Sequence, residues 1–280
     1  MAVIALKTHR VNKPWGRHDL APLFADQPAD QEPTGEIWFE DPADPQRDLL
    51  IKYLFTSQKL SVQVHPNDAQ AQARGFARGK DEAWVVLAAD ANATIGLGLT
   101  KTIDAETFRR SVHDGSIEHL VDWRPAKAGD VIYSPAGTVH AIGAGLVVLE
   151  VQQNLDLTYR LYDYGSAREL HVDDGIAVST PAPYVGISPP RAAAEDRLIM
   201  SENAAFVLEK WTMAGRFTMA PGTVPAWLLP VAGRVTADGR AVERGDAVII
   251  EGESAIEIDA GSTLYVAYPG ARVIDGLIRA

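Results

Sequence analysis

Short runs of β-branched and aromatic residues, each soon broken by Gly, Pro, Asp or Asn, recur along most of this 280-residue chain. Runs of this length and composition form strands that are separated by tight turns. Many short strands in succession are typical of a β-barrel or a β-sandwich. The pattern therefore predicts a mainly β fold.

One segment, residues 104–122, has helical signals instead. Asp104 is a good N-cap, and apolar residues such as Phe108 follow at helical spacing around a break at Gly115. We expect two short helices inserted here between strands. A weaker helical candidate is the Ala- and Gln-rich segment 68–78.

The chain also contains an internal similarity. Residues 127–133 resemble residues 243–249 around a shared Gly-Asp pair, and residues 83–87 resemble residues 226–230. Repeated segments in this order indicate two barrels of related design. We expect the Pro- and Ala-rich segment 179–194 to connect them.

Composition limits the kind of site that the chain can hold. It has no Cys, so a metal must be bound through nitrogen and oxygen ligands. The formal charge is −11 and no run of Lys or Arg is present, which argues against nucleic-acid binding. No apolar stretch approaches the ~18 residues of a membrane span, and the first ten residues lack a cleavage site, so we expect a cytoplasmic protein.

Candidate metal ligands are spread over three segments. Polar and apolar residues alternate around Gln63, so that Ser61, Gln63 and His65 share one face of an extended strand. Glu82 precedes an apolar run, and His140 ends the segment that begins at the first Gly-Asp pair. Two His, one Glu and one amide oxygen form a set that suits zinc, with iron or manganese as alternatives.

These segments resemble a known family. The stretch from Gly129 to His140, with Pro135-Ala136-Gly137 inside it, fits the second cupin motif. Residues 63–68, Gln-Val-His-Pro-Asn-Asp, look like the signature of the mannose-6-phosphate isomerases of the short bacterial type, which are cupins. The resemblance covers about residues 13–165 closely, and it includes segments 13–17, 35–38, 140–145, 150–154 and 158–160.

The resemblance implies a fold and a metal centre. It implies two cupin-like jelly-roll barrels, with a metal-binding unit at residues 1–180 and a degenerate unit at residues 195–280. It also implies one Zn²⁺ per chain, bound by Gln63, His65, Glu82 and His140. In the second copy Pro225 stands in place of Glu82 and Ile256 in place of His140, so we expect no catalytic metal there.

The family interconverts mannose 6-phosphate and fructose 6-phosphate through an enediol, and the resemblance implies this activity and a sugar phosphate as partner. Lys80 lies two residues before Glu82, on the same face of an extended segment, and the matching family Lys is in the active site. Glu150 ends an apolar run, where burial would raise its pKa towards that of a useful base.

Arg160 corresponds to a family Arg that returns to the pocket. A guanidinium there suits either an enediolate or a phosphate group. The alternative is a structural ion pair with Asp156 or Asp163. Lys13, Trp15 and Ser61 are candidate substrate contacts, whereas we expect Trp38 to be a core residue.

Two other functions fit the same residues. One is a metal-holding cupin that binds a sugar or sugar phosphate without turnover, and the other is an isomerase of a different sugar phosphate. Lys80, Glu150 and Arg160 favour an enzyme, because a binding module needs no general base. Gln63 in place of a His argues against a cupin oxygenase.

Overall fold

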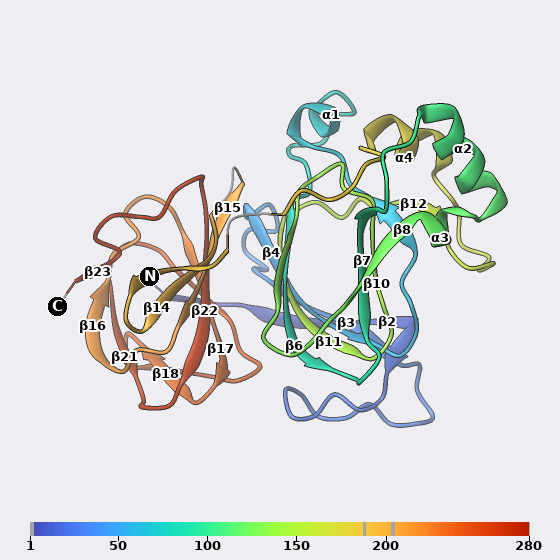
Figure 1. Ribbon diagram of the computed structural model, residues 1–280. Helices are drawn as coiled ribbons and strands as arrows, with labels where there is room; N and C mark the ends of the chain where they lie inside the picture. The colour runs from blue at the N-terminus through green and yellow to red at the C-terminus, as the bar shows by residue number, and fades with distance from the viewer. Residues whose placement is uncertain (1–2, 187–188, 203–204, 280) are drawn as a thin grey trace.

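The computed structural model describes residues 3–186, 189–202 and 205–279, and within them the chain is mainly β, as predicted. Antiparallel strands pair into four sheets, and short helices gather at one end of the molecule (Figure 1). Two sheets build an N-terminal unit and two build a C-terminal unit.

The N-terminal unit consists of a six-stranded and a five-stranded sheet. Their inner faces enclose an apolar core that includes Leu54, Trp84 and Ile142. The six-stranded sheet has the order β2 (Lys7–Arg17), β3 (Thr34–Glu40), β4 (Leu49–Thr56), β11 (Leu146–Gln153), β6 (Glu82–Ala89) and β9 (Val131–Ser134). The five-stranded sheet has the order β12 (Tyr159–Tyr162), β5 (Val62–Val64), β10 (His140–Ile142), β7 (Thr94–Leu99) and β8 (Val121–Pro125).

The C-terminal unit is built in the same way. Its seven-stranded sheet has the order β1 (Val3–Ala5), β20 (Val248–Ile250), β17 (Ala226–Ala232), β22 (Thr263–Pro269), β15 (Phe206–Trp211), β14 (Arg197–Glu202) and β13 (Arg191–Ala194). Its five-stranded sheet has the order β19 (Arg240–Glu243), β18 (Arg234–Ala237), β21 (Ser254–Ile258), β16 (Gly215–Met219) and β23 (Ile278–Arg279).

The two units pack through their larger sheets. Tyr53 and Leu149 on the outer face of the six-stranded sheet share a buried cluster with Trp227 and Tyr265 of the seven-stranded sheet. Strands β4 and β11 are therefore buried on both faces, and all of their residues are buried. This explains why these two strands read as nearly continuous apolar runs rather than as alternating ones.

Helices cover the outer face of the five-stranded sheet of the N-terminal unit (Figure 1). The two predicted helices are present as α2 (Ala105–Asp114) and α3 (Ile117–Leu120); Asp104 caps α2, and Gly115 ends it in the left-handed conformation with φ +79°. Helix α1 (Asp68–Gln72) is shorter than the predicted segment, and α4 (Val172–Val178) was not predicted. Within the described residues no helix combines the length and the apolar character that crossing a membrane requires.

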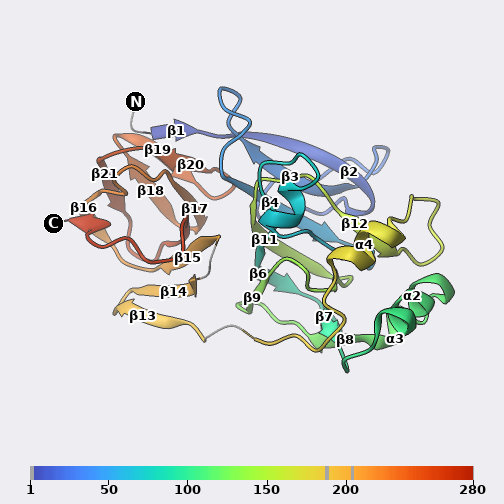
Figure 2. The same ribbon diagram turned by 90° about the horizontal axis from the view of Figure 1, so that it is seen from above.

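Two strands lie outside the expected pattern. Val3–Ala5 pairs with β20, so the start of the chain joins the C-terminal unit before β2 crosses to the N-terminal one (Figure 2). Arg191–Ala194, expected as part of the connection, pairs with β14 at the edge of the seven-stranded sheet. The chain thus crosses between the units at two separate places.

The internal repeat recurs in three dimensions. Gly129 and Gly245 have φ values of +93° and +92°, and in both turns the following Asp side chain accepts a hydrogen bond from the backbone N–H three residues earlier. These distances are 2.9 Å for Asp130 and 3.1 Å for Asp246. The same turn therefore occurs once in each unit.

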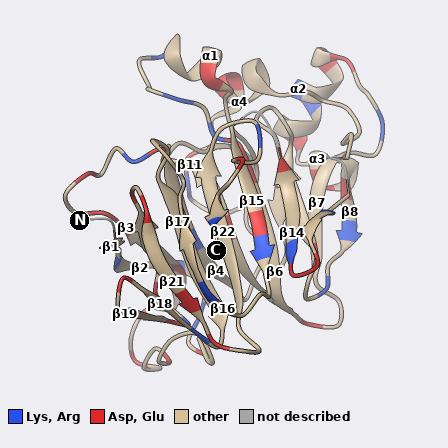
Figure 3. Cartoon of the chain, turned by 90° about the vertical axis from the view of Figure 1, so that its left-hand side faces the viewer, with Lys and Arg blue, Asp and Glu red and all other residues tan. Residues whose placement is uncertain are grey.

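Charged residues are interspersed over the outer side of the C-terminal unit, where red and blue segments alternate (Figure 3).

Candidate active site

Three side chains at one end of the N-terminal unit form a compact buried group. One ligand atom each from His65, Glu82 and His140 lies within 4.8 Å of the others. Glu82 Oε1 is 3.3 Å from His65 Nε2, and Glu82 Oε2 is 3.5 Å from His140 Nε2. Glu82 begins β6 in the six-stranded sheet, whereas His140 begins β10 and His65 follows β5 in the facing sheet.

Backbone carbonyls set the orientation of both imidazoles. Nδ1 of His65 lies 2.9 Å from the Leu157 carbonyl, and Nδ1 of His140 lies 2.9 Å from the Thr138 carbonyl. Each Nδ1 therefore carries the proton and donates it, and each Nε2 presents a lone pair. Outer hydrogen bonds of this kind are typical of metal-binding histidines.

Two of the atoms that face the centre of the group lack hydrogen-bond partners. Nε2 of His65 and Oε2 of Glu82 are buried and make no hydrogen bond within the described part of the chain. Leaving buried polar atoms unpaired is costly unless a further group satisfies them. A carboxylate and two imidazole lone pairs that converge on one point fit a divalent cation.

Gln63 is the nearest neighbour of this group on β5. It is paired directly with His140 across β5 and β10, so both side chains face the inside of the unit. Gln63 Nε2 lies 3.2 Å from His140 Nε2, and Gln63 Oε1 accepts a hydrogen bond from Ser61 Oγ at 3.1 Å. The two amide atoms exchange places by rotation about one bond, so the amide oxygen can also face the centre.

Burial and neighbouring charges set the protonation states. Burial alone would raise the pKa of Glu82, but Lys80 and the two histidines outweigh it and hold this pKa well below its usual range. Burial lowers the pKa of His65 to about 4, aided by the charge of Lys80, and burial also lowers the pKa of His140. At neutral pH the group thus offers one carboxylate and two neutral imidazoles, the forms that bind metal.

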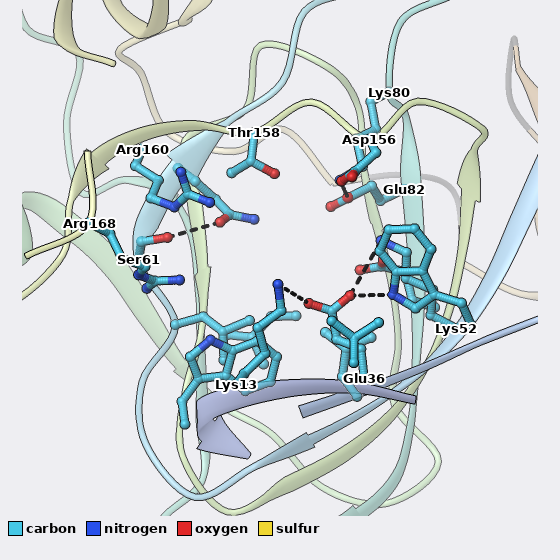
Figure 4. A pocket seen from close by; sticks show the side chains of 18 of the residues that line it. Lys13, Glu36, Lys52, Ser61, Lys80, Glu82, Asp156, Thr158, Arg160 and Arg168 are labelled. Carbon is cyan, nitrogen blue, oxygen red and sulfur yellow. Dashed lines mark hydrogen bonds and ion pairs between the residues drawn. The ribbon is translucent and has the colours of Figure 1, made fainter. Parts of the chain in front are cut away.

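A pocket of about 360 Å³ opens beside the group (Figure 4). Strand β2 supplies one wall through alternate residues, among them Lys13 and Trp15. Ser61 also lines the pocket, so all three predicted substrate contacts border the cavity. The prediction that Trp38 is a core residue is wrong: it is half-buried in the pocket wall, because its position on β3 faces inward beside Lys52.

A row of paired residues crosses the inner face of the six-stranded sheet. Trp38 on β3, Lys52 on β4, Glu150 on β11 and Trp84 on β6 are direct cross-strand neighbours. Lys52 Nζ lies 3.7 Å from Glu150 Oε1, and Trp84 Nε1 donates to Glu150 Oε2 at 2.9 Å. The row aligns a carboxylate, a cation and two indoles on one face.

Glu150 lies in the middle of β11 rather than at the end of a strand, because beyond it the pairing continues for three residues with β4 and for two with β6. Burial raises its pKa to about 7, and the nearby charge of Glu82 adds to this, although Lys52 and Lys80 act in the opposite direction. A carboxylate with such a pKa can exchange a proton near neutral pH.

Glu36 was missed in the sequence and connects two of the pocket cations. Its carboxylate lies 3.6 Å from Lys13 Nζ and 3.6 Å from Lys52 Nζ, and it accepts a hydrogen bond from Trp38 Nε1 at 2.6 Å (Figure 4). Lys52 can be recognised in the sequence, because it is the only charged residue in the apolar run Leu49–Phe55. A single charged residue within a buried apolar strand is expected to face a binding or catalytic site.

Lys80 lies two residues before the first residue of β6, and its Nζ lies 3.0 Å from Glu82 Oε1. Burial would lower its pKa, but Glu82 and Glu150 raise it above the ordinary value, so the ammonium group is retained. This cation and the Glu150 carboxylate both line the pocket beside the His–Glu–His group.

Arg160 lies on β12, directly opposite Gln63 of β5, and lines the pocket. Its Nε is buried without a hydrogen-bond partner, and no carboxylate of the described residues lies within ion-pair distance of its guanidinium. The alternative of a structural pair with Asp163 is wrong, because Arg168 holds both oxygens of that carboxylate. Asp156 is an exposed pocket residue that makes no ion pair with Arg160.

The pocket is more positive than the chain as a whole. Five Lys or Arg residues line it against four Asp or Glu residues, in a protein of net charge −11. Arg168 is one of these cations and was not predicted; two hydrogen bonds to Asp163 fix its guanidinium. A locally positive cavity in an acidic protein favours an anionic ligand.

In the C-terminal unit the matching positions are apolar. Pro225 directly precedes β17, as Glu82 begins β6, and Ile256 is buried on β21 between β16 and β18. This is the place that His140 takes on β10 between β5 and β7.

Comparison with known proteins identifies relatives across most of the chain. A mannose-6-phosphate isomerase of Streptococcus mutans is 35% identical over 215 residues, which are 72% of this chain and 67% of that protein. The mannose-6-phosphate isomerase ManA of Bacillus subtilis is 39% identical over 177 residues, 60% of this chain and 56% of ManA, so this alignment spans little more than half of the relative. No family model matches the chain.

Solved structures extend the likeness to both units. The crystal structure of the mannose 6-phosphate isomerase from Bacillus subtilis superimposes with a TM-score of 0.82 at 26% identity, covering 95% of this chain and 99% of that one. A mutant phosphomannose isomerase from Salmonella typhimurium has the same fold, with a TM-score of 0.73 at 14% identity and coverage of 96% and 100%.

Proposed function

The chain belongs to the mannose-6-phosphate isomerase family, and we propose that it interconverts mannose 6-phosphate and fructose 6-phosphate at the pocket described above. The observation that carries the proposal is that three features meet at this cavity, which Glu82, Glu150 and Arg160 all line. These are the buried His65, Glu82 and His140 group, the carboxylate of Glu150 with its raised pKa, and the unpaired guanidinium of Arg160.

Zinc is the metal that we propose. His65, Glu82 and His140 would hold it, with the amide oxygen of Gln63 as the fourth protein ligand. A nitrogen and oxygen set without thiolate suits this ion, and the unpaired Nε2 of His65 and Oε2 of Glu82 support a cation at this point. Bound zinc would supply Lewis acidity towards the oxygen atoms of the substrate.

The residues around the metal group provide the proton chemistry. Isomerisation removes a proton from C2 of the aldose and returns one to C1, so a group that both accepts and donates near neutral pH is required. Glu150 has this property, since burial raises its pKa to about 7. Lys80, held protonated beside Glu82, adds a cation close to the reacting oxygens.

Arg160 would stabilise the enediolate. Its guanidinium lines the pocket without a carboxylate partner, so its charge is available to a ligand. A preorganised cation aimed at charge that develops in the transition state is an effective catalytic element. Lys13 and Arg168 are the pocket cations that we assign to the phosphate group, since Arg168 is already oriented by Asp163.

A coupled assay tests the proposal directly. Zinc-loaded protein is incubated with mannose 6-phosphate, with glucose 6-phosphate and with unphosphorylated mannose, and the ketose product is measured. We expect fructose 6-phosphate from the first substrate at a rate far above the other two. Tight binding of mannose 6-phosphate without product would instead favour the metal-holding binding protein.

The cytoplasmic location stays a prediction, which cell fractionation can test.

A further inference from the structure

The carboxylate of Asp81 continues the contact between β6 and β9 beyond the point where strand pairing stops. The last residue pair of these strands is Glu82 with Ser134. One residue earlier, Asp81 Oδ1 accepts a hydrogen bond from the backbone N–H of Ala136 at 2.8 Å, and Oδ2 accepts a short one from the Tyr133 hydroxyl. Asp81 therefore holds the end of β9 and the start of the turn that follows it.

This turn carries the chain from one sheet to the other. It leaves the six-stranded sheet at Ser134 and enters the five-stranded sheet at His140. Gly137 has φ +86°, and its N–H donates to the His65 carbonyl at 2.9 Å. The position of His140 relative to Glu82 thus depends on how firmly the turn is held.

Gln153, at the end of β11, holds the backbone of Asp81 in place. The Asp81 N–H donates to Gln153 Oε1 at 2.9 Å, and the Gln153 N–H donates to the Asp81 carbonyl at 3.0 Å. Gln153 Nε2 also donates to Asp68 Oδ1 at 3.0 Å, at the start of α1. The carboxylate of Asp81 therefore projects from an anchored backbone and does not line the pocket.

From this geometry we propose that Asp81 is a positioning residue for the metal centre: it sets the separation of Glu82 and His140 by clamping the turn between them. The inference rests on the proposed metal site. Ligands held at the right separation before binding lose less conformational entropy when the ion binds, so the clamp raises metal affinity. Loss of such outer support typically costs about 10- to 100-fold in affinity.

The test compares two aspartates with the same local bonding. Asp104 also accepts one backbone N–H, at 2.8 Å, and one hydroxyl, at 2.9 Å, both from Thr107, but it caps α2 on the outside of the sheet. Zinc affinity of the full chain is measured by competition with a chromophoric chelator, well below the melting temperature of each metal-free protein. We expect Asp81→Ala to bind zinc about 10- to 100-fold more weakly, whereas Asp104→Ala keeps wild-type affinity.

Two further measurements separate positioning from stability. Asp81→Asn keeps an oxygen acceptor for Ala136 and a polar group for Tyr133, so it should recover most of the affinity. The visible absorption bands of Co²⁺-substituted protein should change in Asp81→Ala and stay unchanged in Asp104→Ala, because they report ligand geometry. If Asp81→Ala does not fold, Tyr133→Phe removes one of the two bonds and should weaken zinc binding by a smaller factor.

Wild-type affinity and an unchanged Co²⁺ spectrum in Asp81→Ala would overturn the inference while leaving the proposed function intact. Equal losses in the two alanine variants would also overturn it, since they would reflect general stability. A wild-type protein that binds no zinc would remove the proposed metal centre itself, and the role of Asp81 with it.

Discussion

His140 and Glu82 belong to opposite sheets of the N-terminal unit, yet His140 Nε2 lies 3.5 Å from Glu82 Oε2. The shared centre is therefore assembled only when the two sheets have come together. A metal bound by both residues would join the sheets at this end of the unit.

Metal removal should lower the thermal stability of the protein. A ligand that binds only the folded state stabilises it by about 4 kcal/mol when its free concentration is 1,000 times its dissociation constant. Melting curves with zinc and with a chelator should differ accordingly. His140→Ala should abolish this difference, whereas His113→Ala, at an exposed position on α2, should preserve it. A melting temperature that is insensitive to zinc in the wild type would contradict the site.

Arg160→Ala should lower the turnover number by about 100-fold or more, with a smaller effect on substrate binding, because the guanidinium acts on charge that appears in the transition state. Bound zinc and the melting temperature should change little, since Arg160 makes no ion pair within the described chain. Steady-state kinetics and a melting curve check this. The matched control is Arg109→Ala, an exposed Arg of α2 paired with Asp173. If the Michaelis constant rises alone, Arg160 binds phosphate instead.

Glu150 should govern the pH dependence. Because its pKa is raised to about 7, the carboxylate is mostly protonated below this pH and cannot act as a base. The ratio kcat/KM should therefore rise with pH and level off above about 7. Glu150→Gln should lower kcat by about 100-fold or more and remove this rise. Glu209→Gln, at a buried carboxylate of the C-terminal unit, should leave the profile unchanged; a wild-type profile in Glu150→Gln would assign the base elsewhere.

Arg168→Gln should mainly raise the Michaelis constant for mannose 6-phosphate, by about 10- to 100-fold, because a charge-assisted contact to phosphate acts in substrate and transition state alike. Inhibition by inorganic phosphate should weaken in parallel. Arg124→Gln is the control, since Arg124 is likewise held by a neighbouring carboxylate, that of Asp122, but lies outside this pocket. Unchanged kinetics with Arg168→Gln would remove this residue from the phosphate contacts.

Much of the fold follows from local sequence signals. The Asp104 cap and the Gly115 break lie next to the helices that they delimit, so these two helices can be predicted without tertiary information. Strand β1 and helix α4 are not, because three apolar residues and a segment containing Asp173 and Gly175 carry no periodic signal. Their structure depends on partners far away in the chain, such as β20.

The residues of the site likewise divide into those that the sequence predicts and those that depend on the pairing of distant strands. Gln63, His65, Glu82 and His140 were predicted from strand alternation and motif spacing, and the structure brings them together; their role as ligands stays a prediction. The partners Glu36, Lys52 and Arg168 were missed. Lys52 meets Glu150 only through the register of β4 with β11, which lie almost 100 residues apart in the sequence. Pairing between distant strands cannot be derived from the residues of either strand alone.

Stepwise metal reconstitution tests the central claim most directly. Protein stripped with a chelator receives zinc in increments below one equivalent, and bound zinc and the rate of fructose 6-phosphate formation from mannose 6-phosphate are measured on each sample. The account predicts a rate near zero in the stripped protein, which rises in proportion to bound zinc and reaches a plateau at one ion per chain. Full activity in the stripped protein, or a full complement of zinc without turnover, would contradict it.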